Sequence, residues 1–152
     1  MPRVSQKKAA QTRARILEGA CQIIIEQGGE ALTFTNLAQQ VGISRSGINC
    51  HFKKKAELLA EIRPCFKALI LQPLSFTSGE RFYLSWVKAV KADKQYQNMI
   101  KYAGTLSSPA EGLLGFKKLI SGNADDVERY VYMAIGFAAV YLSEEQSCCG
   151  CS

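Results

Sequence analysis

The stretch that decides the fold is residues 33–59, which read TFTNLAQQVGISRSGINCHFKKKAELL. The apolar side chains of residues 35–41 have helical spacing, and Gly42 ends that pattern. Ser44 is then placed to cap a second short helix, which is expected to run to His51. Two short helices joined by a tight turn that contains glycine are the sequence form of a helix-turn-helix.

Helical patterns continue on both sides of this stretch. Thr35 is expected to cap the first short helix, and Gly28-Gly29 ends an amphipathic helix that starts near Thr12. Pro64 is expected either to kink the helix that starts near Ala56 or to make it restart. Further helices are predicted over residues 79–92, 95–103, 109–120 and from 123 onward. No segment reads clearly as a strand, so the fold class is all-α.

Pro64 is taken as the boundary between two domains. Residues 8–63 are predicted to be a homeodomain-like, three-helix DNA-binding domain with a helix-turn-helix. Residues 64–145 are predicted to be a helical domain for dimerisation and effector binding. Residues 146–152 are predicted to be a disordered tail. The firmest local prediction in the second domain is a capping box, formed by Ser108 before a helix and Glu111 in its first turn.

Charge is distributed unevenly along the 152 residues, which carry 19 Lys and Arg against 13 Asp and Glu. Residues 1–63 hold ten basic and five acidic side chains, so they carry nearly all of the net charge of +6. This excess favours a polyanionic partner, either nucleic acid or an anionic membrane surface. The uncharged run over 130–142 is too short to span a membrane, and no signal peptide is recognised, so the protein is expected in the cytoplasm.

Residues 33–59, preceded by a basic helix with Thr12-Arg13, resemble the DNA-binding domain of TetR/AcrR-family transcriptional regulators. The resemblance covers about residues 8–63. It implies that the third helix enters the major groove while neighbouring helix ends hold phosphates. The DNA-contacting residues carried over in this way are Thr35, Ser44, Arg45, Ser46, Gly47, Asn49, His51, Lys53 and Lys55.

The chemistry of these side chains suits the roles that the resemblance implies. Arg45 carries a planar donor fork that matches the O6 and N7 acceptors of guanine, and Asn49 can donate to a phosphate or pair with adenine. Gly47 would let the helix approach the groove closely. Lys55 adds positive charge at a helix N-terminus, where backbone amides already favour an anion.

The last helix suggests how the chain assembles. Residues 130–142 contain no charged side chain, and a helix that is apolar all round must be buried on more than one side. A second copy of the chain is the natural cover, so a homodimer is predicted. The predicted interface residues are Tyr130, Ala134, Phe137, Ala138 and Tyr141.

Aromatic residues at helical spacing in the second half have two interpretations. They form either an ordinary core or a pocket for a small apolar or aromatic effector. The pocket residues would be Phe66, Phe82, Trp86, Tyr96 and Tyr102.

The sequence thus predicts a sequence-specific DNA-binding regulator, a dimeric repressor that reads a near-palindromic operator in double-stranded DNA and is released by a small effector. One alternative is a metal or redox sensor that uses Cys148, Cys149 and Cys151; another is a ligand-free architectural DNA-binding protein of the same fold. The other cysteines, Cys21, Cys50 and Cys65, are predicted to be buried or half-buried thiols. No catalytic constellation, cofactor site or metal site is predicted, so the chain is not expected to be an enzyme.

Overall fold

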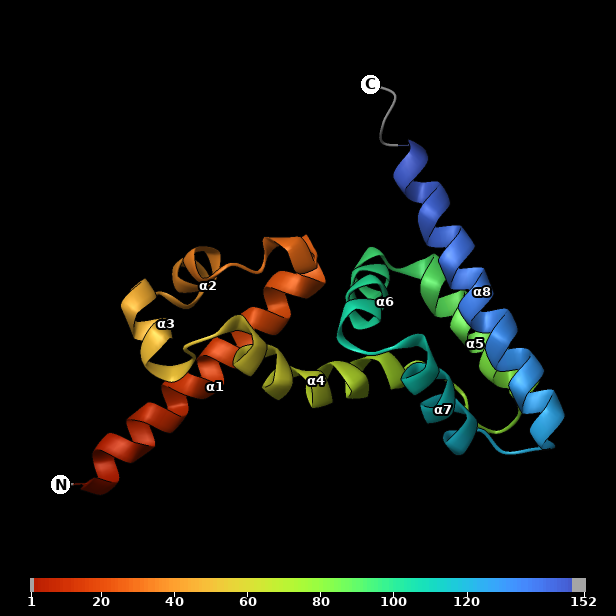
Figure 1. Cartoon of the computed structure of the whole chain (residues 1–152), viewed down its shortest axis with the longest axis horizontal. Coiled ribbons are helices and arrows are strands. Elements are labelled where there is room, and N and C mark those ends of the chain that lie inside the picture. The colour runs from red at the N-terminus through yellow and green to blue at the C-terminus, as the bar shows by residue number, and fades with distance from the viewer. Residues whose placement is uncertain (1, 149–152) are drawn as a thin grey trace. The chain divides into compact units, whose positions relative to one another are not determined.

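A computed structural model of the chain describes residues 2–148, with side chains for 5–108 and 110–144 (Figure 1). Every regular element within residues 2–148 is a helix, which confirms the all-α prediction. The elements are α1 (Pro2–Gln27), the 3₁₀ turn η1 (Gly29–Ala31), α2 (Phe34–Val41), α3 (Arg45–His51), α4 (Lys55–Leu71), α5 (Gly79–Ala92), α6 (Lys94–Leu106), α7 (Pro109–Leu119) and α8 (Ala124–Cys148).

The chain divides into two compact units, and the division falls within α4, between Ala68 and Leu69. The sequence placed the boundary at Pro64, which instead lies inside a continuous helix. Proline cannot donate to the carbonyl of Ala60, but both residues are exposed and water can serve that carbonyl. The helix therefore neither stops nor restarts at the proline.

The first unit is built around the buried face of α1. Ile16, Ala20, Ile23 and Ile24 have no exposed surface and provide the α1 side of the core. The other helices contribute Leu37, Ile48, Leu58 and Ile62, with Phe52 from the link between α3 and α4. Helix α1 lies very close to α2: a Cβ atom at Gly19 would be 2.7 Å from Cγ2 of Val41.

Local capping explains where α2 and α3 begin and end. Ser44 accepts a hydrogen bond from the Gly47 amide at 3.1 Å, as the sequence predicts for the N-cap of α3. Gly42 ends α2 in the left-handed conformation, with φ of 76°. The predicted cap of α2 is wrong, because Thr33 rather than Thr35 accepts the amide of Asn36. Thr35 lies inside the first turn.

The second unit is centred on α5 and α8, which run side by side (Figure 1). Their contact depends on Gly79, where a Cβ atom would be 2.7 Å from Cδ2 of Tyr130 and 3.3 Å from the Asp126 carbonyl. Helix α7 begins with the predicted capping box: Ser108 accepts the Glu111 amide, and the Glu111 carboxylate accepts the Ser108 amide.

Helix α8 buries one face within its own unit and leaves another open. The buried face includes Ala134 and Ala138, which are 1% and 4% exposed. These two predicted dimer residues are therefore already covered by their own chain and do not lie on an open surface. The large apolar side chains that α8 does expose are Tyr132, Met133 and Val140.

The C-terminal end is helical further than the sequence suggests. Helix α8 continues to Cys148, so residues 146–148 of the predicted tail are helical. Residues 149–152, with two of the three terminal cysteines, lie outside the described residues. Over the described part of the chain, no helix combines the length and the hydropathy needed to cross a bilayer.

Candidate nucleic-acid interface

Helix α3 is held by a single buried face. Ile48 has no exposed surface and anchors the helix in the core, whereas Arg45, Ser46 and Asn49 are exposed. Ser44 is exposed as well, and its hydroxyl lies 2.9 Å from that of Ser46. A rigid helix therefore presents a row of short polar groups and one long cation to solvent, which is the composition that base-edge recognition requires.

Gly47 differs in detail from its predicted role. A Cβ atom there would meet Ser44 Oγ at 3.4 Å and Ile43 Cδ1 at 3.5 Å, which are ordinary contacts with the preceding turn. The missing side chain would therefore lie against the turn. The space around Gly47 does not require a glycine.

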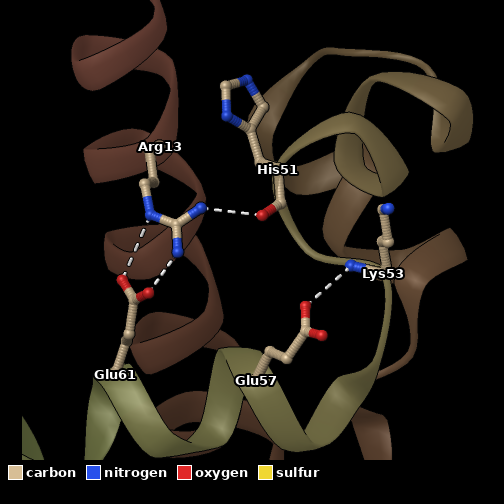
Figure 2. A network of polar contacts seen from close by, with 5 residues as sticks. All are labelled: Arg13, His51, Lys53, Glu57 and Glu61. Atoms are coloured by element: carbon tan, nitrogen blue, oxygen red, sulfur yellow. Dashed lines mark hydrogen bonds and ion pairs between the residues drawn. The ribbon is translucent and has the colours of Figure 1, made fainter.

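The end of α3 is fixed by Arg13, which reaches across from α1 (Figure 2). Its Nη1 donates to the backbone carbonyl of His51 at 2.7 Å, and its Nε donates to Glu61 of α4 at 3.2 Å. Nη2 forms an ion pair with the same carboxylate, and the guanidinium lies 4.1 Å from the ring centroid of Phe52. One side chain thus connects α1, α3 and α4.

The link between α3 and α4 carries the exposed lysines. Phe52 is fully buried, so the chain is anchored immediately before Lys53, Lys54 and Lys55. The Lys53 amide donates to the Glu57 carboxylate at 3.1 Å (Figure 2), and this bond orders the start of α4. The three lysine side chains therefore extend from one fixed segment of backbone, as a phosphate-binding surface requires.

The two remaining predicted contacts lie in the same unit. Thr35 is exposed in the first turn of α2, and the side chain of His51 is half-buried at the end of α3. All nine predicted DNA-contacting residues therefore belong to α2, α3, α4 and the links between them. We refer to these nine residues as the recognition surface.

Sequence reasoning missed the residues that hold the recognition surface in place. Arg13 was noted only as part of a basic helix, and Arg15 donates to the Val41 carbonyl at the end of α2 at 2.8 Å. Both bond to backbone carbonyls at helix C-termini, where a cation also interacts favourably with the helix dipole. The sequence does show two arginines, at positions 13 and 15, in a basic helix. Nothing in the local sequence shows which backbone carbonyls they reach.

Comparison with known proteins agrees with this geometry. The family model described as "Bacterial regulatory proteins, tetR family" matches residues 16–62. Residues 16–62 therefore match the DNA-binding domain of TetR-family regulators. The matched segment contains all nine residues of the recognition surface, while Arg13 and Arg15 precede it.

Several curated HTH-type transcriptional regulators match parts of the chain. The HTH-type transcriptional regulator SrpR of Pseudomonas putida is 26% identical over 113 residues, which are 68% of this chain and 52% of SrpR. The uncharacterized HTH-type regulator TtgW, from a strain of the same species, is also 26% identical, over 83% of its length. An HTH-type transcriptional repressor of Mycobacterium tuberculosis is 40% identical over 58 residues, 38% of this chain and 31% of the repressor. The matched part therefore spans about half of SrpR and most of TtgW.

The predicted effector residues divide between the two units. Phe66 is buried in the first unit, and the other four are buried in the second. There the ring centroids of Phe82 and Tyr96 lie 6.0 and 6.4 Å from that of Trp86. Phe116 of α7, which the sequence did not single out, completes the cluster at 5.4 Å from Trp86. We call Phe82, Trp86, Tyr96 and Phe116 the aromatic cluster.

The alternative of a metal or redox sensor that uses the terminal cysteines is not tested by the described residues. Among the described residues, no group of three or more His, Cys, Asp or Glu side chains is placed to hold a metal ion. Cys149 and Cys151 lie outside that part of the chain.

Proposed function

We propose that this protein is a sequence-specific DNA-binding transcriptional regulator, a dimeric repressor that a small effector releases from its operator. The observation that carries the proposal is the recognition surface: an exposed polar α3, followed by Lys53 and Lys55 on an anchored segment. The name of the mycobacterial relative supports the choice of repressor.

The proposed roles within this surface follow from side-chain chemistry. Arg45, exposed at the start of α3, would read a guanine through its two-pronged donor face. Lys53 and Lys55 would hold phosphates, which fixes the position of the protein on DNA without reading sequence. Arg13 keeps the end of α3 at a set distance from α4, so base and phosphate contacts act together.

The test separates base reading from phosphate binding. The preferred DNA sequence is first selected from a random pool, and affinities for this sequence and for an unrelated one are measured at several salt concentrations. Arg45→Ala should cost roughly 1–3 kcal/mol on the preferred sequence and little on the unrelated one. Lys55→Ala should weaken both by a similar factor and lower the magnitude of the salt slope by about 0.9 for each phosphate that is no longer neutralised.

The matched control is Lys88→Ala, which removes an exposed lysine from α5 in the second unit. It should leave both affinities and the salt slope unchanged. DNA binding that is insensitive to Arg45 and Lys55 alike would refute the proposal. Binding without any sequence preference would favour an architectural DNA-binding protein instead.

Dimerisation is proposed through the open face of α8. Tyr132 and Val140 are each more than half exposed, and Met133 is 44% exposed. Apolar side chains grouped on one helix face mark an interaction surface, and a two-fold operator is matched by a two-fold protein. Two recognition surfaces in such a dimer would read half-sites about 34 Å apart.

The effector is proposed to bind at the aromatic cluster. Trp86 Nε1 and Gln97 Oε1 are buried polar atoms, and neither has a hydrogen-bond partner among the described residues. An acceptor on a bound ligand would satisfy Trp86 Nε1, and a donor would satisfy Gln97 Oε1. Trp86 is the single tryptophan of the chain, so its fluorescence reports directly on this part of the core.

The effector proposal is tested by titrating a panel of aromatic amides and phenols while Trp86 emission and operator affinity are recorded. A ligand that changes the emission should also weaken operator binding, and Gln97→Leu should weaken both responses. A ligand that releases DNA without any change in emission would place the effector elsewhere.

A further inference from the structure

The N-terminal half of α1 extends beyond the other helices of the first unit (Figure 1). Every side chain from Ser5 to Gln11 is exposed, and the first fully buried side chain of the helix is that of Ile16. These first turns therefore contribute no side chain to the core of their own unit. They carry positive charge instead, because residues 1–17 hold five basic side chains and no acidic one.

One side of this segment lines an open groove of about 520 Å³. Most of its lining residues are spaced three and four positions apart, so they share one side of the helix. They are Lys8, Gln11, Thr12 and Arg15, with Ala14 beside them. The hydroxyl of Thr12 already donates to the Lys8 carbonyl at 3.0 Å, so the donors for a ligand come from the other polar side chains. We call this feature the α1 groove.

The α1 groove starts next to the helix-turn-helix. Val41, the last residue of α2, packs closely on Gly19, and its carbonyl accepts a hydrogen bond from Arg15 at 2.8 Å. The Arg15 end of the groove therefore lies where α2 passes into the turn before α3. Lys8 lies seven residues earlier, about 10 Å further along the helix axis. The groove thus leads outward from the helix-turn-helix along α1.

We propose that the α1 groove is a second DNA contact, in which Lys8, Gln11 and Arg15 bind phosphates of the duplex next to the bases that α3 reads. The inference rests on the proposed DNA-binding function and extends it beyond the recognition surface, none of whose residues lies on α1. Ammonium, guanidinium and amide groups are the donors that proteins use for phosphate oxygens. A length of about 10 Å corresponds to about three phosphates of one DNA strand.

The charge of the groove is not cancelled by ion pairs among the described side chains. Near the end of α3, Glu61 pairs with Arg13, and Glu57 accepts a backbone amide. No carboxylate within the described part of the chain is paired with Lys8, and the bond from Arg15 goes to a neutral carbonyl. These cations can therefore neutralise phosphates, and the counterions released from DNA would favour binding.

The test compares two neighbouring lysines of α1. Lys8 lines the groove, whereas Lys7 lies about a quarter of a turn away and does not. Alanine is the best helix former and both lysines are exposed, so neither replacement should impair folding. Affinity for the preferred DNA sequence is measured at several salt concentrations on two duplexes. The short duplex ends at the recognised bases, and the long one has about one helical turn of extra DNA on each side.

On the long duplex, Lys8→Ala should weaken binding roughly three- to tenfold at about 0.1 M salt and lower the magnitude of the salt slope by about 0.9. Lys7→Ala should change the slope by less than half as much, because solvent and salt screen a charge that contacts no phosphate. On the short duplex, Lys8→Ala and the wild type should bind equally well, because the phosphates that Lys8 contacts are missing.

Three results would overturn the proposal: an unchanged salt slope in Lys8→Ala, equal effects of Lys7→Ala and Lys8→Ala, or an effect of Lys8→Ala that persists on the short duplex. The proposed function would survive each of them if Arg45→Ala and Lys55→Ala still weaken DNA binding as expected. A wild-type protein that binds no DNA would overturn both. If Lys8→Ala left DNA binding unchanged but released the protein from vesicles of anionic phospholipid, the groove would be a membrane contact and the proposal would be wrong.

Discussion

Arg13 shows how one side chain can determine the position of a recognition helix. Its guanidinium donates to the last carbonyl of α3, pairs with Glu61 and covers the Phe52 ring. The ion pair is more than a third exposed on both sides, so solvent screens it and it contributes less than about 1 kcal/mol. The hydrogen bond to the carbonyl and the ring contact are less exposed to water and account for most of the stabilisation.

Replacing Arg13 by alanine should therefore destabilise the first unit by about 1–2 kcal/mol and weaken operator binding, because the end of α3 loses its attachment. Chemical denaturation and DNA titration measure the two effects. Glu61→Gln is the matched control, since it removes only the screened ion pair and should cost under about 1 kcal/mol. Equal losses in the two variants would show that the ion pair, and not the carbonyl bond, holds the helix.

The buried phenol of Tyr96 makes the stability of the second unit depend on pH. Its buried hydroxyl donates to the Ile70 carbonyl at 2.9 Å, and burial raises the pKa of this phenol well above 10. The folded state thus keeps a proton that the unfolded state loses. The stabilisation is fully present below the unfolded-state pKa near 10 and is lost as the pH rises from there toward the higher folded-state pKa.

Tyr96→Phe should lower stability at neutral pH by about 1–2 kcal/mol, because the Ile70 carbonyl loses its donor. The same variant should lose stability less steeply above pH 10, since one phenol no longer ionises on unfolding. Denaturation at pH 7, 10 and 11 checks both effects. Tyr83→Phe, which removes a phenol hydroxyl from α5, is the control. If the stability of Tyr96→Phe fell above pH 10 as steeply as that of the wild type, the raised pKa could not belong to Tyr96.

At the scale of elements, the contact between α5 and α8 depends on one glycine. A Cβ at Gly79 would come within 2.7 Å of the Tyr130 ring and 3.3 Å of backbone at Asp126, so the two helices would have to separate. Gly79→Ala should destabilise the second unit by about 1–3 kcal/mol, more than the gain in helix propensity.

Gly104→Ala on α6 is the matched control for Gly79→Ala. Nothing lies within 4 Å of a Cβ at Gly104, so alanine should stabilise the protein by up to about 1 kcal/mol. Thermal unfolding of both variants gives the comparison. A Gly79→Ala protein as stable as the wild type would mean that Tyr130 moves aside without cost.

The elements that sequence predicts well are those decided within a few residues. Ser44, Gly42 and the pair of Ser108 and Glu111 act on backbone amides or conformation one to three positions away, and all are found where expected. Thr33 and Thr35, two residues apart, each carry a hydroxyl of the kind that caps a helix. The chain starts α2 after Thr33, where Asn36 also donates to the Ala31 carbonyl and so fixes the start of the helix.

The features that sequence could not predict join residues far apart in the chain. Arg13 meets carbonyl and carboxylate groups 38 and 48 residues away. Periodicity locates the buried face of a helix but not its neighbour. For the same reason the apolar run over 130–142 indicated burial on several sides, yet did not show that Ala134 and Ala138 face the helix's own unit.

For the whole molecule, the proposed dimerisation through the open face of α8 would bring two recognition surfaces to one DNA. Met133 and Val140 are exposed on that face, and burying a charge there without a partner would cost several kcal/mol at a dimer interface. The double variant Met133→Asp, Val140→Asp should therefore be monomeric at micromolar concentration. Sedimentation and light scattering measure the molecular mass.

The same variant should still bind a single half-site, while its advantage on the full near-palindromic operator disappears, because the two recognition surfaces are no longer linked. Leu84→Asp is the control: it places one such charge at a comparably exposed apolar position, 55% accessible, on α5. It should stay dimeric and keep full operator affinity. If Leu84→Asp dissociated the dimer and the α8 variant did not, the interface would lie on α5 and not on α8. The spacing at which two copies of α3 meet the major groove would then differ as well.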